Sequence, residues 1–148
     1  MKRSLTIAGT LLVVACAAGP GPGDSGYAYN LEGAYTGRLM VEGMPFDATF
    51  DLRTTGAGHV YGTFRVERPL EVEGELSGRI LDDLLRVTVS WLGSGDGAPD
   101  CTRVVEGILT IGPGGAVVDG PVTISDCGDT LSGRLSFRRT APGTPQRP

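Results

Sequence analysis

The chain has 148 residues, and once a cleavable start and loose tails are subtracted it has room for one domain of ordinary size, so a multi-domain organisation is excluded. Its 24 glycines and 10 prolines predict many turns, while a hydrophobic content of 40% is enough for a core and excludes wholesale disorder. The net charge is -4, and this argues against a nucleic-acid partner, because neutralising phosphates requires a basic face.

The first 15 residues have the features of a signal peptide. Lys2 and Arg3 precede an uncharged stretch from Ser4 to Ala15, which is too short for a permanent membrane span but has the length of a secretory h-region. We therefore expect residues 1–15 to direct export and to be removed.

The end of this segment carries a short motif. Val13, Val14 and Ala15 precede Cys16, and this arrangement resembles the lipobox of bacterial lipoproteins, although Val13 stands where Leu is commonest. The resemblance implies that Cys16 becomes the N-terminus and carries a diacylglycerol on its thiol and an acyl chain on its amine, enough for stable membrane anchoring. The alternative is an ordinary signal peptide cut at an Ala-x-Ala-like site.

The remaining cysteines and the flanking segments fit an exported, anchored domain. With Cys16 assigned to lipid, Cys101 and Cys127 are left as one disulfide pair in an oxidising compartment. We expect residues 16–30, which are rich in Gly and Pro from Ala17 to Gly26, to form a flexible tether. We expect residues 141–148 to form a disordered tail. In lipoproteins, the absence of Asp directly after the acylated Cys is associated with the outer membrane rather than the inner one, and Ala17 occupies that position.

Residues 31–140 alternate between apolar and polar side chains and contain no apolar run at helical spacing. This alternation predicts an all-β domain of eight short strands. The expected inward positions are every second residue of 35–41, 46–52, 60–66, 72–80, 85–91, 105–111, 118–124 and 131–137.

The predicted turns set the registers of the hairpins. Two-residue loops are expected at Gly43-Met44, with Val41 opposite Phe46, and at Asp82-Asp83, with Ile80 opposite Leu85. A third hairpin, centred on Gly56, places Leu52 opposite Val60.

The turn at residues 113–115 creates a conflict between face and register. It places Cys101 directly opposite Cys127, but the same register pairs inward Val105 with outward Thr123. A one-residue bulge near Gly120-Pro121 would resolve the conflict.

Eight sequential strands can bury one face by closing into an up-and-down barrel or by folding into a β-sandwich. The barrel is favoured, because inward glycines permit the strong coiling that a narrow barrel needs. The repeats at 33–39 (GAYTGRL), 74–80 (GELSGRI) and 130–135 (TLSGRL), with 88–91 (TVSW), loosely resemble the strands of avidin-like and other calycin-type barrels. The resemblance concerns strand pattern and carries over no ligand contact.

The meander places both termini and the turns near Gly56, Asp82 and Gly114 at one end of the barrel, facing the tether. A ligand or partner is then expected at the opposite mouth. The candidate apolar lining is Met44, Pro45, Pro69, Leu70 and Trp91.

No catalytic residue is predicted, since the expected inward faces contain no ionisable side chain and the single histidine, His59, sits at a strand start without an orienting acid. No cofactor is implied. Four carboxylates at the mouth could form a loose oxygen cage for Ca²⁺, but no loop has calcium-binding spacing and Asp is a favoured turn residue, so no metal site is predicted. The carboxylates concerned are Asp96, Asp100, Asp126 and Asp129.

The sequence therefore predicts a non-enzymatic lipoprotein of the bacterial cell envelope. Its barrel would bind a small apolar ligand or an envelope protein. The alternative is a structural lipoprotein with a solid core and no ligand.

Overall fold

The structure is a computed structural model, and it describes residues 18–67, 71–93 and 101–140. The predicted signal peptide, Cys16 and the C-terminal tail lie outside the described residues, as do Pro69, Leu70, Asp96 and Asp100.

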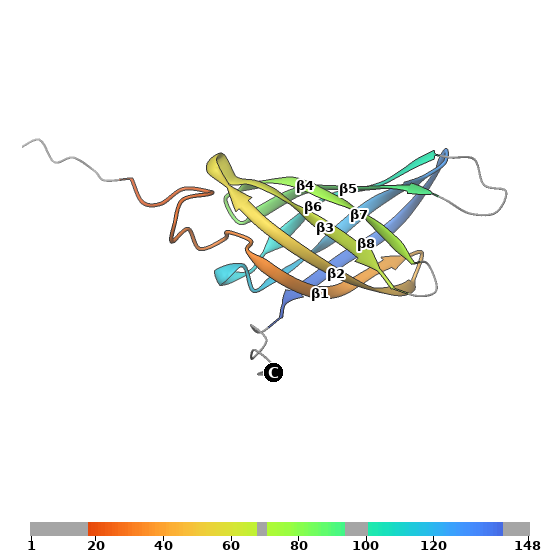
Figure 1. The fold of residues 1–148 in the computed structure, drawn as a ribbon, viewed down its shortest axis with the longest axis horizontal. Coiled ribbons are helices and arrows are strands. Elements are labelled where there is room, and N and C mark those ends of the chain that lie inside the picture. Colours follow the sequence, from red (N-terminus) through yellow and green to blue (C-terminus); the bar gives the residue numbers. More distant parts are fainter. Residues whose placement is uncertain (1–17, 68–70, 94–100, 141–148) are drawn as a thin grey trace, which may run out of the picture.

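Eight antiparallel strands form one closed barrel (Figure 1). In chain order they are β1 (Gly33–Val41), β2 (Met44–Thr55), β3 (His59–Val66), β4 (Val72–Leu81), β5 (Leu84–Gly93), β6 (Cys101–Ile111), β7 (Val117–Asp126) and β8 (Asp129–Arg139). Each strand pairs with the next, and β8 pairs with β1, for example Leu39 with Leu135. This last pairing confirms the up-and-down barrel and excludes the sandwich, whose two sheets would leave edges open. In the described part of the chain, no helix is long and apolar enough to span a membrane.

The predicted alternation accounts for the core. None of the expected inward positions is exposed, and, apart from Leu31, every buried apolar residue belongs to that set. No polar or charged side chain among the described residues is buried. The driving force for closure is therefore burial of one apolar face per strand.

Aromatic rings occupy the barrel along its length. Tyr35 packs edge-on against Phe137 with ring centroids 5.5 Å apart, and Phe137 lies 4.5 Å from Phe50. Phe50 in turn lies 5.4 Å from Phe64, which contacts Trp91 at 5.9 Å. These five rings, here called the aromatic column, pack through the interior and leave it filled with side chains rather than hollow along their path.

Glycine at two inward positions permits close packing between strands. A Cβ at Gly37 would lie 2.5 Å from the Cα of Phe137, and a Cβ at Gly62 would overlap the carbonyl oxygen of Asp51. Both neighbouring atoms belong to the backbone and cannot rotate away. The inward glycines therefore allow the strong coiling that the sequence pattern suggested.

Two hairpins have registers that differ from the prediction. The β1–β2 loop is Glu42-Gly43 rather than Gly43-Met44; both residues have positive φ, 46° and 85°, and Val41 faces Met44. The β2–β3 turn is a short 3-10 segment at Gly56–Gly58, so Leu52 faces Gly62 rather than Val60. Each register shift is two residues, which preserves every predicted face because side chains alternate with period two.

The β4–β5 hairpin confirms its predicted register, with Ile80 opposite Leu85 around Asp82-Asp83. The β6–β7 pairing has no bulge near Gly120-Pro121, contrary to the prediction. The Gly112 amide donates to the Val117 carbonyl across a turn one residue longer than predicted, and this places Val105 opposite Ile124, both inward.

Cys101 and Cys127 form the predicted disulfide, with Cα atoms 5.6 Å apart. They are not direct partners, because the β6–β7 register, extended from Val104 opposite Ser125, would place Cys101 opposite Gly128. Cys127 lies with Gly128 in the β7–β8 turn, where both residues have positive φ. The disulfide joins the start of β6 to this turn.

A segment before β1 closes one end of the barrel, and the sequence did not predict this cap. Leu31 is fully buried. Its amide donates a hydrogen bond to the Thr54 Oγ1 at 2.8 Å, and the Thr54 hydroxyl donates back to the Leu31 carbonyl. The Asn30 side chain bonds to the Gly23 amide and the Asp24 carbonyl, which folds the residues read as tether back on themselves. The chain from about residue 21 onward therefore packs on the barrel.

The same end is locked by Tyr35 and Arg139. The Tyr35 hydroxyl donates to the Gly115 carbonyl at 3.0 Å and accepts a bond from the Arg139 guanidinium, which also lies 5.4 Å from the Tyr35 ring centroid. Two further bonds from Arg139 reach the carbonyls of Gly114 and Asn30. We call this end, with the cap, the closed end, and the opposite one the mouth.

Candidate functional site

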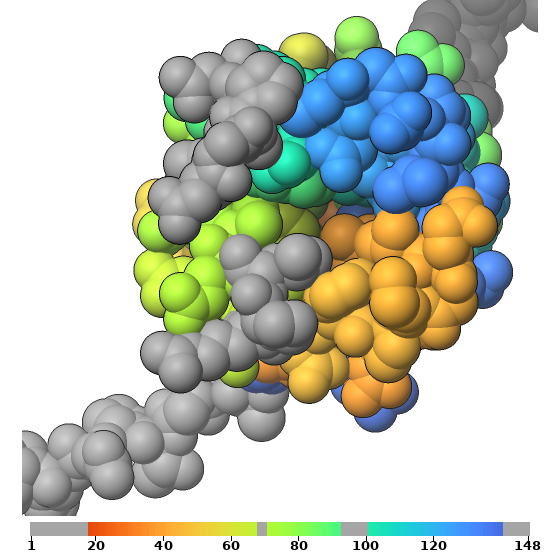
Figure 2. Space-filling model, turned by 90° about the vertical axis from the view of Figure 1, so that its right-hand side faces the viewer, coloured from red at the N-terminus to blue at the C-terminus, as the bar shows by residue number. Residues whose placement is uncertain are grey.

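The mouth is formed by the C-terminal ends of β1, β3, β5 and β7 and the starts of β2, β4, β6 and β8. The described chain begins at the other end, beside the β2–β3 and β4–β5 turns (Figure 1). Figure 2 looks onto the mouth, where a recess opens between the β1–β2 hairpin, in orange, and the yellow-green ends of β3 and β4. The mouth is thus the part of the described barrel farthest from the incoming chain.

Five apolar side chains form the floor of the mouth. Each occupies an inward position at the mouth end of its strand, is half-buried, and packs against the core. They are Val41, Phe46, Val72, Trp91 and Leu131. Because the floor is apolar and partly open to water, covering it with an apolar partner would be favourable.

Trp91 is the most distinctive residue of the floor. Its ring lies on Phe64 at the end of the aromatic column, and its indole Nε1 is buried without a hydrogen-bond partner. A buried donor left unpaired costs about 1–3 kcal/mol. Because protein atoms cover this donor, an acceptor of a bound molecule reaches it only when the indole or its neighbours shift.

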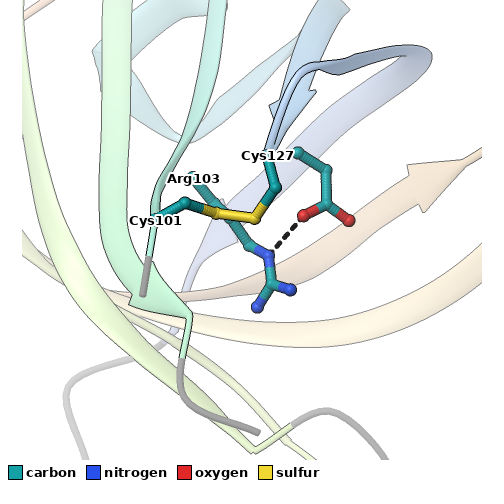
Figure 3. A network of polar contacts seen from close by, with 4 residues as sticks. Cys101, Arg103 and Cys127 are labelled. Atoms are coloured by element: carbon teal, nitrogen blue, oxygen red, sulfur yellow. Dashed lines mark hydrogen bonds and ion pairs between the residues drawn. A yellow bond between two sulfur atoms is a disulfide. The ribbon is translucent and has the colours of Figure 1, made fainter. Parts of the chain in front are cut away.

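An ion pair lies beside the floor. Arg103 on β6 is opposite Trp91 in the β5–β6 register, and its Nε donates to the Asp126 carboxylate at 2.5 Å. Their side chains are 25% and 41% exposed, so this pair is shielded more than an ordinary surface pair. Figure 3 shows Arg103 next to the Cys101–Cys127 disulfide, which holds β6 and the β7–β8 turn together around the pair.

The residues predicted to line the site have different positions. Trp91 belongs to the floor as predicted. Met44 takes an inward register position at the rim, opposite Val41, and is 58% exposed. Pro45 alternates outward and is exposed, so it lies on the outer wall rather than in the lining. Pro69 and Leu70 lie outside the described residues.

Arg103 was missed as a residue of the mouth, and Asp126 was placed there only as a turn carboxylate, because the inward alternation was followed only between Val105 and Ile124 on these strands. Continuing the period of two by one step reaches Arg103 on β6 and Asp126 on β7. The expectation that inward positions carry no ionisable group therefore holds for the buried core but is wrong at the mouth.

Among the described residues, one group of three could offer ligands to a metal ion: Cys101, Asp126 and Cys127, whose ligating atoms lie within 4.8 Å of one another. Both sulfurs are consumed by the disulfide, and Asp126 is paired with Arg103. His59 is exposed at the start of β3 at the closed end, away from these groups. The arrangement provides a disulfide clamp and an ion pair rather than a metal centre.

Two grooves of about 540 and 520 Å³ lie along the rim and the outer wall. The first is bordered by charged side chains of β2 to β4, among them Arg65, whose pKa is raised by its hydrogen bond to Glu73 and by the charge of that carboxylate. The second follows β1, β2 and β8 and includes Arg38 and Asp47, which pair at 3.1 Å. Of the five floor residues, only Val72 lines the first groove, and none lines the second.

Comparison of the chain with protein-family models, with curated proteins and with solved structures found no match in any of the three. Functional inference for this chain therefore depends on its own residues and their geometry.

Proposed function

We propose that this chain is an exported lipoprotein of the bacterial cell envelope, anchored through acylated Cys16 and displayed on the outer membrane. The charged start, the apolar run and the lipobox-like residues 13–16 support the export and the anchor. The barrel adds a compatible geometry, because the described chain enters at the closed end and the mouth lies opposite. An anchored barrel would present its mouth away from its point of attachment.

The role that the geometry supports best is non-enzymatic binding of an envelope protein at the mouth. The observation that carries this proposal is the half-buried apolar floor with the unpaired Trp91 N–H. The aromatic column leaves the floor shallow, which suits an apolar side chain of a partner protein better than a small molecule enclosed in the barrel. A partner carbonyl could accept from Trp91 once the indole shifts to expose its N–H.

The second candidate is a structural envelope lipoprotein that binds nothing at its mouth. The filled interior favours it, since a barrel that carried a ligand internally would need a cavity along its axis. The two candidates differ in whether the mouth is occupied in the native envelope.

Photo-cross-linking in the native envelope distinguishes them. We place a photoreactive phenylalanine analogue at Met44 or Leu92, both exposed at the mouth, and as a control at Val117, which is exposed at the closed-end start of β7. The proposal predicts one defined protein adduct from the mouth positions and none from Val117.

A Trp91→Phe variant sharpens the test because it keeps an aromatic ring but removes the N–H together with part of the indole surface. We expect it to reduce the yield of the Met44 adduct several-fold, in line with the loss of one buried hydrogen bond. The absence of an adduct at both mouth positions, or an identical adduct at Val117, would refute the partner and leave the structural role.

A further inference from the structure

One part of the outer wall gathers basic side chains. His59 on β3 is opposite Arg79 on β4, and Arg79 is opposite Arg86 on β5. Arg53 on β2 lies next to this row, opposite Tyr61. All four basic side chains are exposed, and together we call them the basic wall.

The described part of the chain supplies no acidic partner for the three arginines of the basic wall. Elsewhere on the described barrel, four arginines are neutralised by a carboxylate, Arg139 bonds to Tyr35 and to backbone carbonyls, and Arg138 on β8 is the other arginine without an acidic partner. Those with a carboxylate partner are Arg38, Arg65, Arg103 and Arg134. Like charges directly opposite on neighbouring strands are destabilising, so the Arg79–Arg86 pair is not explained by folding.

Acidic groups on the same wall lie around the row rather than within it. Asp51 and Glu75 are nearer the mouth on their strands, and Glu106 is opposite Thr88 on the mouth side of Arg86. Asp82 and Asp83 form the β4–β5 turn beyond the row. The basic wall is therefore a local positive area on a chain whose net charge is -4.

Exposed apolar side chains border the basic wall. Tyr61 lies beside Arg53 and is 49% exposed, while Ile108, opposite Arg86, is 52% exposed. Leu81 and Leu84 flank the β4–β5 turn and are 46% and 39% exposed. Basic residues mixed with exposed Tyr, Leu and Ile are the composition of surfaces that bind the membrane interface.

The basic wall also lies toward the closed end, since the β2–β3 and β4–β5 turns that flank it are beside the incoming chain (Figure 1). We propose that the basic wall binds the phosphate headgroups of anionic lipids and rests the β3–β5 side of the barrel on the membrane. This inference rests on the proposed lipid anchor, which would hold the closed end near a bilayer. The anchor supplies attachment, and the wall sets the orientation of the barrel, with the mouth kept at its far end.

The test uses residues 16–148 with Cys16→Ser, which lack the apolar signal peptide and cannot be acylated, so the outcome does not depend on the anchor. Binding is measured by co-sedimentation with vesicles of phosphatidylcholine alone and with vesicles that also contain phosphatidylglycerol. The test variant is Arg79→Gln/Arg86→Gln. The control, Arg38→Gln/Arg65→Gln, changes the net charge equally but removes arginines that already have carboxylate partners.

We expect a preference for phosphatidylglycerol vesicles that weakens with added salt and falls roughly thirtyfold in the test variant, since each basic side chain near an anionic surface changes partitioning about fivefold. The control variant should retain most of the preference. Unchanged Trp91 fluorescence in both variants would show that the fold is intact.

Equal binding to the two vesicle types, or equal losses in test and control variants, would overturn the proposal. Arginine-dependent binding to a soluble polyanion such as heparin, without preference for phosphatidylglycerol vesicles, would also overturn it in favour of an anionic polymer. A non-acylated native Cys16 would remove the anchor but would leave the vesicle result standing, so the two failures are distinguishable.

Discussion

Replacing Phe50 by alanine is expected to lower the free energy of unfolding by about 3–5 kcal/mol, the largest effect of any single substitution proposed for this protein. Phe50 is 3% exposed and contacts both Phe64 and Phe137, so its removal interrupts the aromatic column at its centre. Urea denaturation followed by circular dichroism measures the change.

Tyr61→Ala is the matched control, because Tyr61 is an aromatic residue of the neighbouring strand that points outward and is 49% exposed. It should cost no more than about 0.5–1 kcal/mol. Similar losses for Phe50→Ala and Tyr61→Ala would contradict a solid interior and would indicate a barrel with space around its axis.

Removal of the disulfide is expected to destabilise the domain by about 3.5 kcal/mol, on the chain-entropy estimate for a loop of this length. The bond joins residues separated by 26 positions and closes β6 and β7 into one loop. The variant Cys101→Ser/Cys127→Ser, compared with the parent by urea denaturation under non-reducing conditions, measures the effect.

Cys16→Ser serves as the control for loss of a cysteine, since Cys16 lies outside the barrel in sequence. Reduction of the parent protein should reproduce the destabilisation of the double variant and should not affect the double variant itself. A decrease in the free energy of unfolding of less than about 1 kcal/mol would contradict this prediction, because it would mean that the disulfide does not constrain the unfolded chain.

The sequence predicted the faces of the strands better than their registers. Alternation identifies which side chains are buried, and hydrophobic burial then enforces that face whatever the turn does. The β1–β2 loop was misplaced because Glu42 adopts a positive φ of 46°, which is unusual for a residue other than glycine. Gly43 was the stronger signal, and it occupies the second rather than the first position of the loop.

The cap at the closed end was not predictable from composition. Residues 17–26 are rich in Gly and Pro, which predicts a linker, yet Asn30 folds the segment back on itself through Asp24 and Leu31 ties it to the barrel through Thr54. These are contacts between single side chains and backbone groups that have no periodic pattern. Their formation depends on a barrel end that exists only after the strands have closed.

The sequence predicted the location of the candidate site at the mouth but only some of the residues that form it. Connectivity alone located the mouth, and Trp91 was identified by its position at the end of an inward run. The Arg103–Asp126 pair was missed because it requires the true β6–β7 register, which in turn depends on the length of the turn after Gly112. The floor residue Phe46 was assigned inward but not recognised as part of the site.

The claim that this is a lipid-anchored envelope protein is tested most directly by intact mass spectrometry of the mature chain purified from its native envelope. The expected result is a chain that begins at Cys16 and carries the mass of a diacylglycerol and one further acyl group. A mature chain with an unmodified N-terminus downstream of Cys16 would contradict the claim.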